Sequence, residues 1–586
     1  MGKMSRMVAV VAVMTLAMAS IAGAASAATG SSGSSRSSVT VSDYVVLVAE
    51  GSSDADAVKA VIAAGGTVDA TNTAVGVLKV STSNPSFVNQ VSAAKAIEGA
   101  ARDKVIGRVP TSPRPAGEIE RLDAERATST PTAASAAAGK GAPSTTRPSK
   151  KADPLTPLQW DMQAIGAPQA HNVLMGDHRV RVGIMDTGID GTHPDIAPNF
   201  DARLSRNFTV DIPLIDGPCE VPSCVDPNNV DEDGHGTHVA GTIGSPRNGI
   251  GIEGVAPGVD LVNVRAGQDS GYFFIGPFVD AMTYAGDIGL DVVNMSFYID
   301  PWLYNCRSNP ADSPEAQIEQ RTIISATQRA INYAHRKGVT LISAMGNEHT
   351  DLGNPTFDDT SPDFPPDAAY ERTVDNSCLN LPTEAKYVIG VTSTGPSGRK
   401  AYYSNFGVEQ AEVAAPGGDY REFFGTPDYA TPKNLILAPY PEAVGRANGD
   451  IDETGEPTTD FVVKDCTAGP CSYYQYLQGT SMASPHAVGV AALIVARYGF
   501  GFGARFGLPP AITEALLYRS ANPTPCPDPA TFVYPGLSDV YTATCTGTPS
   551  LNGFFGHGEV NALNAVLGAP GHAPASASSG APALTP

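Results

Sequence analysis

The sequence predicts a doubly wound α/β protein with a mostly parallel sheet and helices on both faces, preceded by a small βαββαβ unit. Two observations lead to this fold class. Residues 156–568 alternate helical segments with Val- and Ile-rich runs that show little polar alternation, as expected of strands buried on both faces. Residues 40–107 alternate shorter strands and helices. The 586 residues are 42% hydrophobic and 17% charged, which excludes a wholly disordered chain and a coiled coil.

The elements of the large domain follow from these apolar runs. The expected strands are Val180–Met185, Leu261–Arg265, Val292–Phe297, Val339–Ala344 and Tyr387–Thr392. The expected helices include Phe278–Ile288 and Ala316–Lys337, the second ended by Gly338. In such a fold the functional groups lie at the carboxyl ends of the strands.

The front unit has the order of a ferredoxin-like domain. Its expected strands are Asp43–Ala49, Thr67–Asp69, Ala74–Val80 and Ala101–Val109, and its expected helices are Asp54–Ala64 and Pro85–Ile97. Residues 110–155 are rich in Ala, Pro, Ser, Thr, Lys and Arg and predict an exposed linker. Residues 569–586 repeat this bias and predict a disordered tail.

The first 27 residues have the organisation of a secretory signal. Lys3 and Arg6 precede an apolar run over residues 7–24, and Ala25-Ser26-Ala27 is a small-residue cleavage site. The alternative is a membrane anchor, since the run approaches the ~20 residues that a span needs. The Ser/Gly-rich stretch after the cleavage site favours removal. We therefore expect a secreted, extracellular protein with no membrane contact after signal cleavage.

Eight cysteines in an oxidising compartment suggest disulfides, although eight allow 105 connectivities. Proximity along the chain suggests Cys219–Cys224, Cys466–Cys471 and Cys526–Cys545, which leaves Cys306–Cys378. The alternatives are zinc ligation or free thiols, but the spacings resemble no common zinc site.

Charge divides the chain into two parts. Residues 1–151 hold 16 basic and 11 acidic residues, whereas residues 152–586 hold 22 basic and 49 acidic ones. The acidic balance of the whole chain argues against nucleic acid or an anionic membrane as a partner.

Three segments carry groups that suit nucleophilic catalysis. They are VGIMDTGID at residues 182–190, DGHGTHVAGT at 233–242 and GTSMASPH at 479–486. A serine hydroxyl needs an imidazole to take its proton, and the imidazole needs a carboxylate that fixes its tautomer. Asp186, His235 and Ser481 supply these groups. A fourth segment, SAMGNE at 343–348, follows a strand and offers an amide to an oxyanion.

Each residue also has a simpler interpretation. Asp186 alone would be a turn residue and Ser481 alone a helix cap. His235 and His238, three residues apart, would suit a metal, but no third ligand has a suitable spacing. Ser481 does not lie in Gly-x-Ser-x-Gly, which speaks against an α/β-hydrolase esterase.

Taken together, the three segments resemble those of the subtilisin-like serine proteases, the subtilases. The order Asp, His, Ser is that of subtilisin, and the resemblance extends to GVAP at 254–257, VNMS at 293–296, SNFG at 404–407 and GEVNA at 558–562. It implies that Asp186 orients His235, that His235 is the general base and then acid, and that Ser481 is the nucleophile. It also implies that Asn347 donates to the oxyanion.

The resemblance further implies the organisation of the precursor. Residues 1–27 would be a signal peptide, 28–109 a propeptide that assists folding and inhibits, 110–155 the linker, 156–568 the catalytic domain and 569–586 the tail. The expected activity is that of a monomeric, secreted serine endopeptidase acting on protein or peptide substrates. A catalytically inactive, peptide-binding homologue is the alternative, although every residue of the triad is present.

Some positions depart from the family pattern. Ser296 is followed by Phe297 and Tyr298 where the family has Leu and small glycines, so we expect Tyr298 to crowd the substrate groove. Glu348 is placed on the rim of the specificity pocket or, equally, in solvent. Insertions around residues 351–381 and 418–478 suggest a narrow cleft, and the role of the second one stays open.

The resemblance requires no cofactor but makes a structural calcium ion plausible. The matching positions are Asp195 and Asn248, both oxygen donors suited to a hard cation. Arg247 lies in the same loop, and an arginine could take the place of the cation.

Overall fold

A seven-stranded parallel sheet forms the centre of the large domain, in the order β13-β12-β9-β8-β5-β7-β6. The computed structural model describes residues 41–104, 151–365, 368–467, 469–501 and 506–572. The expected signal segment, nearly all of the linker and most of the tail lie outside these residues. The strands are β5 (Arg181–Met185), β6 (Arg206–Asn207), β7 (Asp260–Arg265), β8 (Val292–Met295), β9 (Thr340–Ala344), β12 (Val388–Thr394) and β13 (Val413–Pro416). The expected α/β fold class is confirmed.

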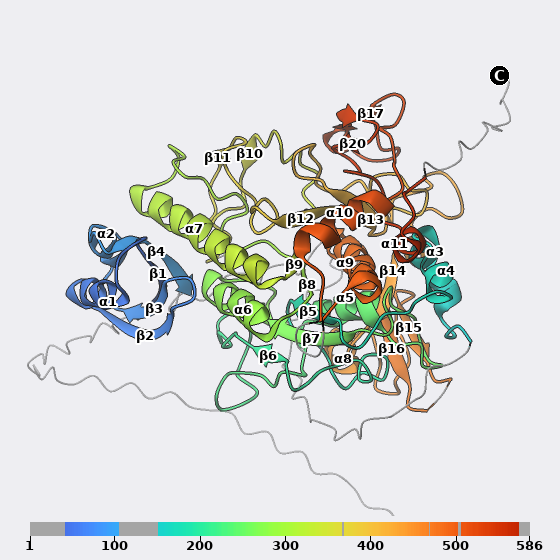
Figure 1. Cartoon of the computed structure of the whole chain (residues 1–586), viewed down its shortest axis with the longest axis horizontal. Coiled ribbons are helices and arrows are strands. Elements are labelled where there is room, and N and C mark those ends of the chain that lie inside the picture. The colour runs from blue at the N-terminus through green and yellow to red at the C-terminus, as the bar shows by residue number, and fades with distance from the viewer. Residues whose placement is uncertain (1–40, 105–150, 366–367, 468, 502–505, 573–586) are drawn as a thin grey trace, which may run out of the picture. The chain divides into compact units, whose positions relative to one another are not determined.

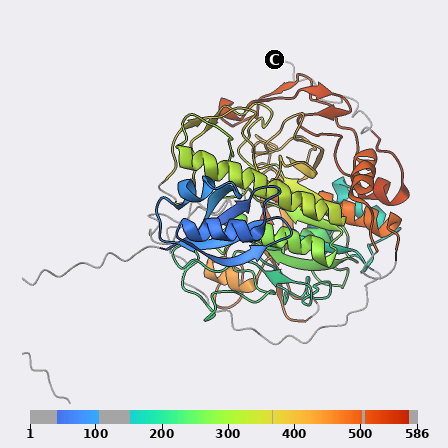
Figure 2. The same ribbon diagram turned by 60° about the vertical axis from the view of Figure 1, so that its left-hand side comes forward.

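Helices cover both faces of this sheet, as its continuous apolar strands require. On one face lie α6 (Ile275–Ile288) and α7 (Pro314–Lys337), side by side in both views (Figure 1 and Figure 2). On the other lie α5 (His235–Gly244) and α9 (Thr480–Tyr498). Shorter helices are α3 (Trp160–Ala164), α4 (Ala167–His171), α10 (Pro510–Ser520) and α11 (Ala562–Leu567). Each face therefore has its own apolar core.

The front unit is a four-stranded antiparallel sheet with two helices, in the expected order βαββαβ. Its elements are β1 (Ser42–Val48), α1 (Asp54–Ala63), β2 (Gly66–Asn72), β3 (Val77–Thr82), α2 (Phe87–Ser92) and β4 (Ile97–Lys104). Several expected boundaries of this unit were wrong, and two by four or five residues: the second helix ends at Ser92 rather than Ile97, and the last strand begins at Ile97 rather than Ala101. Ile97 pairs with Val48 of β1, which requires extended backbone where local propensity favours a helix.

The four expected disulfides are all present. Cys219 joins Cys224, Cys306 joins Cys378, Cys466 joins Cys471, and Cys526 joins Cys545.

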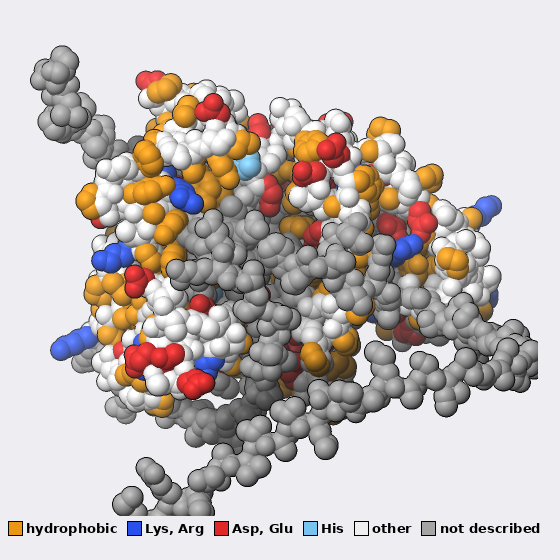
Figure 3. All heavy atoms as spheres, turned by 180° about the vertical axis from the view of Figure 1, so that it is seen from behind, with side chains coloured by type: hydrophobic (Ala, Val, Ile, Leu, Met, Phe, Trp, Pro, Cys, Tyr) orange, Lys and Arg blue, Asp and Glu red, His pale blue; other side chains and the backbone are white. Residues whose placement is uncertain are grey.

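The surface of one face mixes groups of acidic side chains with apolar ones (Figure 3). Among the described residues, no helix is both long enough and apolar enough to cross a membrane.

The insertions form small sheets of their own. Residues 418–478 contain β14 (Ile436–Pro439), α8 (Glu442–Ala447), β15 (Val462–Asp465) and β16 (Ser472–Leu477), with β16 in the middle of three strands. The insertion around 351–381 contains β10 (Phe357–Asp358) and β11 (Arg372–Thr373). Two further pairs near the C-terminus are β17 (Thr531–Phe532) with β18 (Ala543–Thr544), and β19 (Gly547–Thr548) with β20 (Leu551–Asn552).

The sheet of the larger insertion supports α5. Nε2 of the buried His238 lies 3.1 Å from both the Ile436 and the Gln475 carbonyl oxygens, so this nitrogen carries the proton and donates. Its Nδ1 is buried with no hydrogen-bond partner. Burial lowers the pKa of His238 to about 3. His238 is therefore a neutral structural residue, facing the insertion rather than a metal shared with His235.

This buried histidine makes the fold sensitive to acid. Unfolded histidine has a pKa of about 6.5, so between that value and about 3 only the unfolded chain takes up the proton. The free energy of unfolding should therefore fall as the pH is lowered through this window, by up to about 1.4 kcal/mol per pH unit. We expect the H238Q variant, made in the S481A background, to lose this contribution. Between pH 6 and 5 its free energy of unfolding, measured by urea titration, should fall by about 1.4 kcal/mol per pH unit less than that of S481A alone.

The exposed His178 provides the control. Its hydrogen bond to Asp260 raises its pKa, which gives the opposite sign of pH dependence. H178Q should therefore not reduce the acid-side slope, and equal slopes for H238Q and its parent would show that His238 does not cause the acid sensitivity.

Candidate active site

Asp186 and His235 are joined by a short hydrogen bond at the carboxyl end of the sheet. Asp186 directly follows β5, is 0% exposed, and its Oδ1 accepts from His235 Nδ1 at 2.7 Å. The same oxygen accepts from the Thr187 backbone N–H at 2.8 Å. Burial raises the pKa of Asp186, and the neighbouring His235 opposes that rise. The pairing leaves Nε2 as the ring nitrogen on the far side from the carboxylate.

The N-terminus of α5, which begins at His235, is fixed by a carboxylate that the sequence analysis missed. Asp231 Oδ2 accepts from the Thr237 backbone N–H at 2.9 Å, and Oδ1 accepts from Thr187 Oγ1 at 3.0 Å. Asp231 therefore links the helix of His235 to the residue beside Asp186. An acidic residue just before a helix is a capping signal, so the run 231–233 could have revealed it.

Ser481 is the second residue of α9, which begins at Thr480. Pro485 lies in the second turn of α9, where a proline lacks the backbone N–H that would otherwise donate to the Ser481 carbonyl oxygen. The Ser296 hydroxyl replaces that donor, with Oγ 3.1 Å from the Ser481 oxygen. The Ser481 hydroxyl in turn lies 3.4 Å from the Ser296 carbonyl oxygen. The Ser296 hydroxyl, just after β8, thus supplies the hydrogen-bond donor that Pro485 of α9 lacks.

Asn347 is attached to the start of the same helix. Its Oδ1 accepts from the Thr480 backbone N–H at 2.9 Å and from Thr480 Oγ1 at 3.0 Å. The Thr480 hydroxyl also accepts from the Gly346 N–H at 2.9 Å. These bonds orient the amide, and its nitrogen is the end turned away from Thr480.

The other predicted groove residues have defined partners. Tyr298 Oη donates to Asp363 Oδ2 at 2.5 Å, so the tyrosine connects the chain after β8 to the 351–381 insertion. Glu348 Oε2 accepts from Asn405 Nδ2 at 2.6 Å. Phe297 stacks on Phe273 with ring centroids 4.0 Å apart. Bulky side chains therefore follow Ser296.

The predicted calcium pair is occupied by hydrogen bonds. Asp195 Oδ1 accepts from Asn248 Nδ2 at 3.1 Å, and Oδ2 accepts from the Ile252 N–H at 3.0 Å and from Tyr474 Oη at 3.2 Å. Arg247 pairs with Glu253 at 2.6 Å. Calcium binding by this pair stays a prediction.

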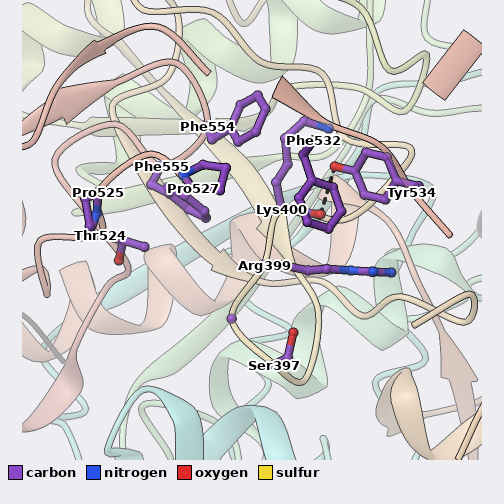
Figure 4. A pocket seen from close by; sticks show the side chains of 11 residues that line it. Ser397, Arg399, Lys400, Thr524, Pro525, Pro527, Phe532, Tyr534, Phe554 and Phe555 are labelled. Atoms are coloured by element: carbon purple, nitrogen blue, oxygen red, sulfur yellow. Dashed lines mark hydrogen bonds between the residues drawn. The ribbon is translucent and has the colours of Figure 1, made fainter. Parts of the chain in front are cut away.

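A pocket of about 230 Å³ lies elsewhere, between the chain around Lys400 and the C-terminal strands. Arg399, Lys400, Phe532 and Tyr534 are among its lining residues (Figure 4). Burial lowers the pKa of Lys400 to about 7, and its Nζ donates to the Ala401 carbonyl oxygen. None of the predicted catalytic residues lines this pocket, so it is no candidate for the active site.

Comparison with known proteins agrees with this geometry. The model of the subtilase family matches residues 177–558. Subtilisin BL of Lederbergia lenta is 26% identical over 337 residues, covering 58% of this chain and 84% of that protein. M-protease of Shouchella clausii is also 26% identical, but only 59% of its length is matched. The crystal structure of the epidermin leader peptide processing serine protease from Staphylococcus aureus has a TM-score of 0.57 at 20% identity, covering 90% of this chain and 98% of that one.

A parallel α/β sheet with an aspartate–histidine pair at its carboxyl edge and a serine at a helix start defines a class of serine hydrolases. The family match covers more than half of the chain. The chain belongs to the subtilase family of serine-type endopeptidases.

A double-mutant cycle can test whether the Ser296 hydroxyl replaces the backbone N–H that Pro485 lacks. S296A should leave the buried Ser481 carbonyl without a donor and lower the free energy of unfolding by about 1–3 kcal/mol. P485A supplies a backbone N–H to the same carbonyl. In the P485A background, S296A should therefore cost at least about 1 kcal/mol less, as measured by urea denaturation.

Equal costs of S296A in both backgrounds would show that the serine does not replace the missing N–H. S484A is the matched control, because Ser484 Oγ donates to Asn294 Oδ1 rather than to the Ser481 carbonyl. Its cost should not depend on residue 485.

Proposed function

We propose that this chain is a secreted serine endopeptidase that hydrolyses peptide bonds through Asp186, His235 and Ser481. The observation that carries the proposal is the 2.7 Å hydrogen bond from His235 Nδ1 to the buried Asp186. It fixes the imidazole tautomer that a general base needs. The packing of α5 against α9 brings the two helices that bear His235 and Ser481 together.

In the proposed reaction, Ser481 Oγ attacks the carbonyl carbon of the scissile peptide bond while His235 Nε2 takes the hydroxyl proton. Asp186 stabilises the resulting imidazolium. The Asn347 amide nitrogen and the N-terminus of α9 stabilise the negative charge on the carbonyl oxygen. His235 then gives the proton to the leaving amine, and water hydrolyses the acyl-enzyme through the same base.

We also propose that the chain is made as a zymogen, with residues 28–109 as the inhibitory propeptide. Opposite charges support this. Lys79 and Arg102 of the front unit pair with Asp280 of α6 at 2.5 Å and Glu315 of α7 at 3.0 Å. The carboxylate of Asp103 accepts from the Gly276 N–H at 2.7 Å, at the N-terminus of α6. The front unit, which lies in the cysteine-free and basic part of the sequence, thus contacts the acidic large domain. Maturation would remove the front unit from that domain.

Ser481→Ala tests the nucleophile and the maturation together. Removing the nucleophile of subtilisin lowers kcat roughly 10⁶-fold, so S481A should cleave no member of a peptide library at a measurable rate. Mass spectrometry should find its N-terminal region still attached, whereas the parent should have lost residues up to about 150. S484A is the matched control on the same helix and should keep both activities.

Undiminished cleavage by S481A would refute the assignment. The same peptide library tests whether the substrate cleft is narrow. If Tyr298 and the 351–381 insertion narrow it, the parent protein should cleave only a subset of the peptide sequences. Cleavage of unfolded casein with no residue preference would contradict that restriction.

A further inference from the structure

The chain between Cys526 and Cys545 is a segment with a strand pair of its own. The disulfide between these two cysteines closes the segment, and β17 pairs with β18 inside it. Tyr534 Oη, within the segment, donates to the Lys400 carbonyl oxygen at 3.0 Å (Figure 4). Aromatic side chains of the segment also share a small apolar core with side chains among residues 401–406. The disulfide-closed segment therefore has a defined place on the large domain.

Tyr541 of this segment contacts the chain near the candidate active site. The centroid of its ring lies 4.7 Å from that of His349 and 5.2 Å from that of Tyr402. His349 is two residues after Asn347, the predicted oxyanion donor. The Tyr402 hydroxyl accepts from Gln478 Nε2 at 3.2 Å, and Gln478 is two residues before α9. Tyr541 thus lies beside both segments that lead to the proposed catalytic groups.

The rings of Tyr541, His349 and Tyr402 form a surface that is partly open to solvent. Tyr402 is buried, whereas His349 and Tyr541 are each half-buried. Val540, beside Tyr541 in the chain, is 61% exposed, so the disulfide-closed segment reaches solvent at this point. The outer edges of two of the three rings are therefore available to a bound peptide.

All three rings of this surface are neutral at pH 7. Burial and the nearby Lys400 lower the pKa of His349, so its imidazole is mostly uncharged. Burial raises the pKa of Tyr402 to about 12, so its phenol keeps its proton. Lys400 is the charged group that acts on His349, and its ammonium form would repel a cationic substrate residue. The surface therefore fits an uncharged, flat side chain.

We propose that Tyr541, together with His349 and Tyr402, binds an aromatic side chain of the substrate close to the scissile bond. Tyr541 is then a specificity-determining residue that contacts the substrate away from the reacting atoms. The inference rests on the proposed proteolytic function, because it names a substrate preference of the same site. It is separate from the effect expected of Tyr298, which is joined to the 351–381 insertion.

The physical basis of the preference is contact between aromatic rings. Offset and edge-on ring pairs are favourable beyond the area that they bury, whereas an alanine at the same substrate position would leave the surface in water. The contact is made in the bound substrate and in the transition state alike. Its loss should therefore appear in the KM for an aromatic peptide rather than in kcat.

The test compares cleavage of a peptide library, varied on both sides of the scissile bond, by the parent, Y541A and Y541F. At one substrate position the parent should prefer an aromatic residue to alanine by about threefold or more in kcat/KM. Y541A should lose most of that ratio through a higher KM for the aromatic peptides. Y541F should keep it, because both contacts of Tyr541 are made by its ring.

Labelling of Ser481 by a fluorophosphonate separates this inference from the proposed function. A parent that is not labelled and cleaves no peptide would overturn the proposed function, and the inference with it. A labelled parent without an aromatic preference would overturn the inference alone, as would a Y541A that keeps the preference or slows all peptides equally. V540A is the matched control, because it shortens the exposed neighbouring side chain and should keep the parent's ratio.

Discussion

The arrangement of this protein depends on the hydrogen bond between Asp186 and His235. A carboxylate that is 0% exposed can stay at the end of β5 because the His235 imidazole and the Thr187 N–H both donate to it. The surrounding structure holds those two donors in place. Asp231 caps α5 and binds Thr187, and the sheet of the 418–478 insertion supports the same helix through His238. The proposed chemistry thus rests on a chain of buried polar contacts rather than on one residue.

A second constraint is the placement of negative charge. The front unit offers Lys79 and Arg102 to acidic residues of α6 and α7, whereas Arg265 meets several carboxylates within one domain. Lys79 and Arg102 belong to the propeptide that we propose is removed on maturation. In the second case one buried guanidinium pairs with two carboxylates of the same domain. The excess of acidic residues in the large domain is therefore unevenly compensated.

Much of the fold could be predicted from the sequence because its strands are long apolar runs. Met185 and Ala344 end strands where the sequence places those ends, and Asp186 follows directly. Boundaries set by distant pairing could not be predicted: Ile97 is extended because of Val48. The same holds for the site. The motifs identified Asp186 and His235, but only the structure reveals that Ser296 replaces the donor that Pro485 lacks, or that Tyr541 contacts His349.

The most direct test of the central claim is where an active-site probe reacts. A fluorophosphonate forms a covalent bond with a serine hydroxyl only where a neighbouring base activates it. We expect peptide mapping to find the adduct on Ser481 in the parent. H235A, which removes the imidazole, should lose the adduct while remaining folded. An adduct on another serine, or undiminished labelling of Ser481 in H235A, would contradict the proposal that Asp186, His235 and Ser481 act as one unit.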